Sequence, residues 1–98
     1  MKLTLKNIKY FAEMSEETPC YRADLYMDGE YVAIAKNIGC GGSTDIHYVN
    51  GINSAEAQRL EEYAKTHPVV FNYQGEEYKF YGVDYIVDSL FDSWMEKQ

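Results

Sequence analysis

Four acidic side chains recur at four-residue steps close to the end of the sequence, at Asp84, Asp88, Asp92 and Glu96. In a helix each such step turns by about 40°, so the row covers roughly 120° of the helix surface, opposite an apolar stripe. Like charges at this spacing destabilise a helix by about 0.2–0.5 kcal/mol per pair, and no lysine interrupts the row. The row is either a solvated polar face or a surface that docks on a basic region of a partner, much as a row of phosphates would.

Tyrosine is the second residue type that could make contacts, since 10 of the 98 residues are tyrosine. Exposed tyrosines add contact area with little loss of conformational entropy. They can equally pack under a helix with the hydroxyl at the surface. Tyr85 lies beside the acidic row in sequence, and Tyr26 falls on the polar side of an alternating segment. The predicted partner-binding residues are therefore Asp84, Asp88, Asp92, Glu96, Tyr85 and Tyr26.

A glycine-rich stretch at residues 39–44 offers a different chemistry. A phosphate-binding loop needs glycines followed directly by a helix, usually with a Lys-Ser/Thr pair, and both features are missing here. Successive backbone amides with nearby hydroxyls could still form a nest for a nucleotide-sized ligand. This alternative site comprises Gly39, Gly41, Gly42, Ser43, Thr44 and His47. The other interpretation is a wide turn that needs glycine for its backbone conformation.

Cysteine and histidine are too sparse and too scattered to predict a metal site. The four candidate ligands, Cys20, Cys40, His47 and His67, contain no C-x₂-C or H-x₃-H pair. Cys40, Asp45 and His47 could form a nucleophilic triad only if the fold brought them together, and nothing in their spacing requires it. We expect free thiols, no metal, no cofactor and no enzymatic activity.

Alternation of polar and apolar residues predicts strands through the first half of the chain. The first runs from Leu3 to Met14, with a change of phase at Lys6-Asn7 that is typical of a β-bulge. Strands at 20–27 and 30–36 flank Asp28-Gly29, a strong hairpin signal, and Val32 and Ile34 are expected to share a face. A short strand is expected at 46–49.

The second half alternates between helix and hairpin. A helix capped by Asn53, with Glu56 completing the cap, is expected to run to Pro68. Strands at 69–73 and 77–81 flank Gln74-Gly75. A final helix carries one apolar stripe, formed by Val83, Ile86, Val87, Leu90, Phe91 and Trp94. The order β-β-β-(β)-α-β-β-α predicts an α+β fold in which a small antiparallel sheet, of about five or six strands in hairpins, packs against two helices.

Length and charge limit the classes of function. The 98 residues are expected to form a single domain, residues 1–98. A net charge of −7 disfavours direct binding of nucleic acid, whose phosphates attract basic proteins. No apolar run is long enough to span a membrane and no signal-peptide core is visible, so a cytoplasmic protein is expected. An unpaired strand edge would allow a homodimer.

The first half of the sequence contains a series of short motifs: KNIK at 6–9, SEET at 15–18, Cys20-Tyr21, Ala23, Leu25-Tyr26, Asp28-Gly29, Asn37, Gly39, Gly41-Gly42 and His47-Tyr48. This series resembles the pattern of a family of small proteins encoded by phages and prophages. This chain reads His-Tyr-Val at 47–49 where the family pattern has Tyr-His-Pro. The second half, with its acidic row, is not part of the pattern.

The resemblance implies a context rather than a catalytic residue. Small acidic accessory proteins of phages are often inhibitors of host defence, and anti-CRISPR proteins that block a Cas nuclease are the leading case. Together with the acidic row, this predicts an inhibitor that binds a basic surface of a host defence protein in the host cytoplasm. The alternative is a module that sequesters a nucleotide in the glycine-rich stretch.

Overall fold

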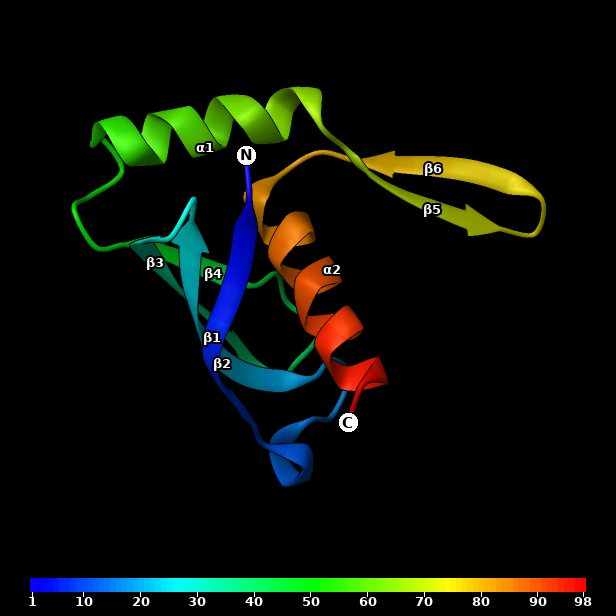
Figure 1. Ribbon diagram of the computed structural model, residues 1–98. Coiled ribbons are helices and arrows are strands. Elements are labelled where there is room, and N and C mark those ends of the chain that lie inside the picture. Colours follow the sequence, from blue (N-terminus) through cyan, green and yellow to red (C-terminus); the bar gives the residue numbers. More distant parts are fainter.

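The structure is a computed structural model that describes all residues 1–98, and it has an α+β architecture (Figure 1). A four-stranded antiparallel sheet has the order β1-β2-β3-β4, and β5 and β6 form a separate hairpin. The predicted fold class and element order are confirmed, and the six strands are divided between these two sheets instead of forming one. The elements are β1 (Leu3–Tyr10), the short 3₁₀ helix η1 (Ala12–Met14), β2 (Cys20–Met27), β3 (Glu30–Ile38), β4 (Asp45–Tyr48), α1 (Ala55–Thr66), β5 (Val69–Tyr73), β6 (Glu76–Phe80) and α2 (Val83–Glu96).

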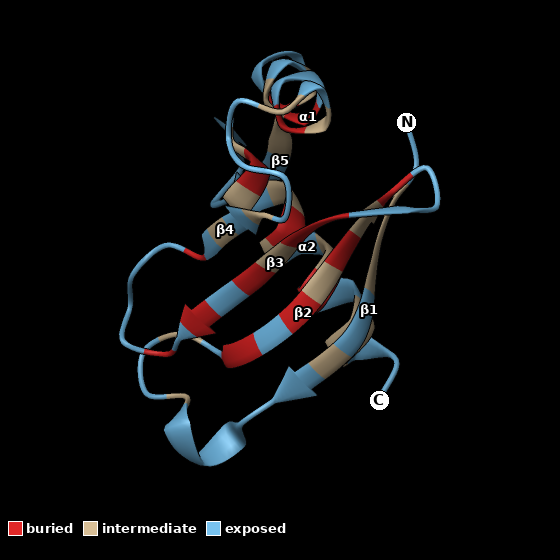
Figure 2. Ribbon diagram, turned by 90° about the vertical axis from the view of Figure 1, so that its left-hand side faces the viewer, coloured by how far each residue is buried: buried red, intermediate tan, exposed pale blue.

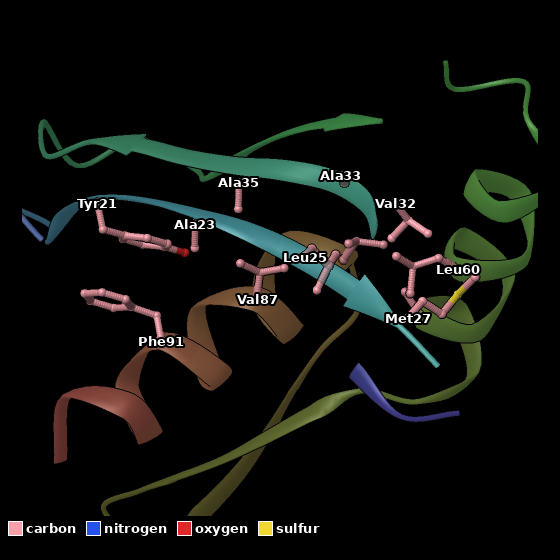
Figure 3. Close-up of a cluster of buried hydrophobic side chains, with 12 residues drawn as sticks. Tyr21, Ala23, Leu25, Met27, Val32, Ala33, Ala35, Leu60, Val87 and Phe91 are labelled. Atoms are coloured by element: carbon pink, nitrogen blue, oxygen red, sulfur yellow. The ribbon is translucent and has the colours of Figure 1, made fainter. Parts of the chain in front are cut away.

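The core lies between the inner face of the four-stranded sheet and the two helices. Buried residues recur along the central strands β2 and β3, whereas β1 has none (Figure 2). α2 crosses that face, and α1 lies over one end of the sheet (Figure 1). Figure 3 shows a continuous row of buried side chains, with the Tyr21–Phe91 pair at one end, Leu25 and Val87 in the middle and Leu60 at the other end. Every residue of the predicted apolar stripe of α2 is buried in this cluster or packs against it. The stripe therefore positions α2 as the sequence predicts.

β1 contains the predicted bulge. Its pairing with β2 shifts between Lys6 and Lys9, and Asn7 adopts a φ of 53°. Asparagine tolerates this left-handed conformation better than most residues, and the Asn7 amide donates a hydrogen bond to Asp24 Oδ2 at 2.8 Å. The extra residue changes the phase of the strand, so that Ile8 packs against the core.

Two sequence predictions about the strands are wrong. The first strand ends at Tyr10 instead of Met14, because the Met14 amide bonds back to the carbonyl of Phe11 and closes a 3₁₀ turn. Ile34 does not share the buried face of Val32. A second register shift lies where β3 begins to pair with β2, and the added residue reverses the faces along the rest of the strand.

Both hairpin turns have the expected left-handed backbone. Asp28 and Gly29 have φ values of 52° and 85°, and Gln74 and Gly75 have values of 51° and 80°. Two consecutive positive φ values match the right-handed twist of the flanking strands. The β5–β6 hairpin projects away from the rest of the molecule (Figure 1), a feature that the alternation pattern does not reveal.

α1 begins one residue later than predicted. Ser54, not Asn53, is the N-cap, because the Ser54 hydroxyl oxygen accepts a hydrogen bond from the Ala57 amide at 3.2 Å. The same hydroxyl donates to the carbonyl of Gly51 at 2.8 Å, which anchors the serine in the preceding turn. Serine caps a helix as well as asparagine does. Glu56 therefore lies one position too early to complete the predicted capping pair.

Candidate functional site

The acidic row lies along α2, but its four members do not have the same environment. Asp92 and Glu96 are exposed, whereas Asp84 and Asp88 are half-buried. The prediction of a row lying wholly opposite the apolar stripe is wrong at Asp88. On an α-helix this position is only about 60° from Phe91, so its carboxylate lies at the border of the buried face.

Asp88 joins α2 to the sheet. Its Oδ1 accepts hydrogen bonds from the Tyr21 hydroxyl, at 2.7 Å, and from the Thr44 hydroxyl. Both donors are buried, and the Tyr21 ring stacks on Phe91 with ring centroids 3.9 Å apart. Burial raises the pKa of the Tyr21 hydroxyl, and the adjacent carboxylate of Asp88 raises it further. Asp88 therefore has a structural role that its place in the row does not suggest.

The glycine-rich stretch folds around one buried amide, that of Asn37. Its Oδ1 accepts from the Thr18 hydroxyl at 2.9 Å and from the Gly39 amide at 2.8 Å. Its Nδ2 donates to the Gly42 carbonyl at 3.2 Å and to the Thr44 hydroxyl at 3.1 Å. The side chain thus makes four hydrogen bonds, which is all that an amide group can make.

This arrangement explains the stretch as a conformational element. Gly39 has a φ of 85°, and a Cβ on it would collide with the carbonyl oxygen of Met14. The Gly41 amide donates to the Thr18 hydroxyl at 3.3 Å, and the hydroxyl of Thr44 is directed to Asp88. Three of the groups that could line an anion nest, the Gly39 and Gly41 amides and the Thr44 hydroxyl, are therefore engaged within the protein. The carboxylate of Asp88 beside them would repel an anion.

The other members of the predicted ligand site differ in environment. Gly42 and Ser43 are exposed, and a Cβ on Gly42 would contact nothing. His47 is exposed on β4, where it pairs with Ile34 on the outer side of the sheet. Nucleotide binding in the stretch stays a prediction, and the structure adds no group that would favour it.

The acids of α2 are not neutralised by basic residues of the chain. The three ion pairs of the structure are Asp28–Arg59, Glu62–Lys65 and Glu77–Lys79. Partial burial raises the pKa of Asp92, and the neighbouring carboxylates of Asp88 and Glu96 raise it further. The row therefore carries like charges that oppose one another and have no basic neighbour at ion-pair distance.

Two hollows lie on either side of the Asp88–Asp92 step. One, of about 150 Å³, borders the glycine-rich stretch and includes Thr18, Asn37 and Gly42. The other, of about 280 Å³, lies between α2 and the β5–β6 hairpin, and its walls are mainly apolar. We call this second hollow the hairpin groove; it is lined by Val69, Val70, Phe71, Phe80, Tyr85, Asp88, Ser89 and Asp92.

The structure brings one of the two predicted tyrosines to the acidic row. Tyr85 is exposed in the first turn of α2, and its ring stacks on Phe80 of the hairpin at 5.0 Å. Tyr26 lies on the outer side of the sheet, away from α2, where it stacks on Tyr31 at 5.5 Å. The Lys6 ammonium is 4.4 Å from the centre of the Tyr26 ring. Tyr26 is therefore not part of the same surface.

The cysteine and histidine side chains do not form a cluster. Cys20 is buried and Cys40 is exposed, and both thiols are free. No hydrogen bond joins Cys40, Asp45 and His47, and no group of three or more His, Cys, Asp or Glu residues is placed to hold a metal ion. Neither helix is long and apolar enough to cross a membrane.

Sequence reasoning missed two parts of the site. The first is the Tyr21–Asn37–Thr44 network behind Asp88, because the predicted strand stopped at residue 36 and left Asn37 outside it. The second is the hairpin groove, because the sequence does not show which way a hairpin projects. Phe71, which is 56 % exposed, indicates an interaction surface at this groove, but its exposure is known only from the structure.

The fold and this surface define an α+β protein with an unneutralised acidic helix beside an aromatic hairpin. Comparison with known proteins found no matching family model, no matching curated protein and no matching solved structure. The functional interpretation therefore depends on the chain's own surface and on the chemistry that this surface can recognise.

Proposed function

We propose that the protein is a non-enzymatic inhibitor that docks the acidic side of α2 on a basic surface of a partner protein. The observation that carries the proposal is the unneutralised row itself. Asp92 and Glu96 are exposed and outside every ion pair of the structure. A helix selected for stability alone would gain from lysines at four-residue spacing, so the row favours a basic binding partner.

The proposed partner is a nuclease-type protein of host defence, such as a Cas effector. Its nucleic-acid channel is basic because it must hold phosphates. Successive acids of the row are about 6 Å apart along the helix axis, so a band of negative charge along one side of α2 can occupy a channel that otherwise binds a nucleic-acid backbone. The net charge of −7 and the resemblance to phage-encoded proteins support the same class of partner.

The test is inhibition of DNA cleavage by a panel of purified RNA-guided nucleases, with charge reversals that avoid the structural Asp88. We expect the Asp92→Lys/Glu96→Lys double variant to inhibit about tenfold less well than the natural chain, since each reversal turns an attraction into a repulsion. Glu13→Lys/Glu30→Lys is the matched control, because it makes the same charge change at exposed positions of η1 and β3 that form no ion pair.

The two double variants separate the proposal from a general charge effect. Docking through α2 requires that the control retains full inhibition and that binding weakens as ionic strength rises. Equal losses in both double variants would mean that net charge, and not the row, matters. If no nuclease of the panel is inhibited, the proposed class of partner is wrong.

A further inference from the structure

The β5–β6 hairpin presents an aromatic face that the rest of the chain leaves exposed. Paired residues of an antiparallel ladder point to the same side, so the Val69–Phe80 and Phe71–Tyr78 pairs share one face with Tyr73. Phe71 and Tyr73 are each 56 % exposed. A hairpin of two strands is only marginally stable by itself, and aromatic side chains exposed at this level mark an interaction surface.

This face forms one wall of the hairpin groove, and α2 forms the other. Phe71 and Phe80 stand on the hairpin side, while Asp88 and Asp92 line the α2 side. Asp88 Oδ1 already accepts from Tyr21 and Thr44, so the exposed carboxylate of Asp92 is the main acceptor that α2 offers to the groove. Tyr85 joins the two walls through its 5.0 Å stack on Phe80. No lysine, arginine or histidine lines the groove. Its only charged residues are therefore acidic, and the rest of its lining is mainly apolar.

An arginine side chain satisfies both walls at once. Its guanidinium is planar, stacks on aromatic rings and donates paired hydrogen bonds to carboxylates. A lysine ammonium is a more strongly hydrated point charge without a flat face, so it gains less from the aromatic wall. The volume of about 280 Å³ also accommodates a side chain rather than a folded element.

We propose that the hairpin groove binds an arginine side chain of the partner, held between the aromatic face of β5–β6 and the carboxylates of α2. This inference rests on the proposed function, because it assigns the chemistry that the docking surface recognises. It adds a specificity for arginine over lysine that a row of acids alone would not have.

The test uses fluorescently labelled hexa-arginine and hexa-lysine peptides, which carry the same charge, and measures binding by anisotropy. We expect the natural chain to bind hexa-arginine about fivefold more tightly than hexa-lysine, the size of a partly exposed cation–π contact. Phe71→Ala and Tyr85→Ala should each abolish this preference. Ile52→Ala is the matched control, because Ile52 is 58 % exposed and does not line the groove.

Equal affinity for the two peptides, no binding of either, or an arginine preference that survives Phe71→Ala would overturn the inference. A concentration-dependent dimer that Phe71→Ala dissociates would also overturn it, because the occupant would then be a second copy of the chain. In the nuclease assay, inhibition lost in Asp92→Lys/Glu96→Lys but kept in Phe71→Ala would leave the proposed function standing without the arginine site. Inhibition kept in both variants would reject docking through α2 itself.

Discussion

Replacement of Asp88 by alanine is expected to destabilise the protein far more than loss of any other acid of the row. The substitution removes the acceptor of two hydrogen bonds and leaves the hydroxyls of Tyr21 and Thr44 without it in a buried setting. A hydrogen bond to a charged group contributes about 1.5–3 kcal/mol. Because Asp88 is half-buried and water can replace part of this contribution, we expect a loss of about 3 kcal/mol in the free energy of unfolding.

A double-mutant cycle tests the origin of that loss. Tyr21→Phe in the natural chain should cost about 1.5 kcal/mol, since it removes one bond to the carboxylate. In the Asp88→Ala background the same change should cost much less, because the only remaining contact of the hydroxyl, with Thr44 Oγ1, is long at 3.4 Å. Urea unfolding followed by circular dichroism measures all four corners, and Glu96→Ala is the control at an exposed position.

Thermal unfolding gives an independent measure. A loss of about 3 kcal/mol corresponds to a fall in Tm of roughly 12–24 °C for a domain of this size. Glu96→Ala should change the free energy of unfolding by less than about 0.5 kcal/mol. If Asp88→Ala costs no more than Glu96→Ala, or if Tyr21→Phe costs the same in both backgrounds, Asp88 does not hold α2 to the sheet in the way described.

Two further predictions concern the acidic row and the glycine-rich stretch. Asp92→Asn should stabilise the protein at pH 7 by about 0.5 kcal/mol, by removing repulsion from its acidic neighbours. The pKa of Asp92 is raised in the folded state, so as the pH falls the folded chain takes up a proton at Asp92 before the unfolded chain does. The stability advantage of the variant should therefore fade as the pH falls through the folded-state pKa, and vanish below the unfolded value of 3.8. Urea unfolding from pH 7 to pH 3 checks this, and an advantage that stays constant or grows would contradict it. Gly39→Ala should lower the free energy of unfolding by about 1–3 kcal/mol, because Gly39 has a positive φ and an added Cβ would collide with the carbonyl oxygen of Met14. Gly42→Ala should change it by less than about 0.5 kcal/mol. Equal effects of the two variants in thermal unfolding would refute this account of the stretch.

Most of the fold follows from local rules that the sequence displays directly. Alternation gives the strands, Asp28-Gly29 gives the hairpin turn, and the apolar stripe of α2 gives its buried face. The failures lie where two local rules compete. Asn53 and Ser54 are both good caps, and only the contact of Ser54 with the preceding turn decides between them. Which side of the sheet Ile34 faces depends on a bulge that the residue types around it do not reveal.

The candidate site was predictable only in part, for a different reason. The row on α2 is a property of one helix, so its spacing could be read from the sequence. Whether Asp88 faces solvent or Thr44 depends on segments 44 residues apart in the chain, which no local pattern specifies. The same holds for Tyr26 and Tyr85, which look alike in sequence but lie on different sides of the sheet.

The main sheet is a meander, in which each strand pairs with the next strand of the chain. Such pairings close short loops and cost little chain entropy during folding. The contact of α2 with β2 is different, since Tyr21 and Asp88 are separated by 67 residues. Strand pairing is therefore expected to precede the docking of α2, and the hydrogen bonds of Asp88 should act chiefly on the rate at which the folded chain opens. The helix that carries the proposed binding surface would then also set the kinetic lifetime of the fold.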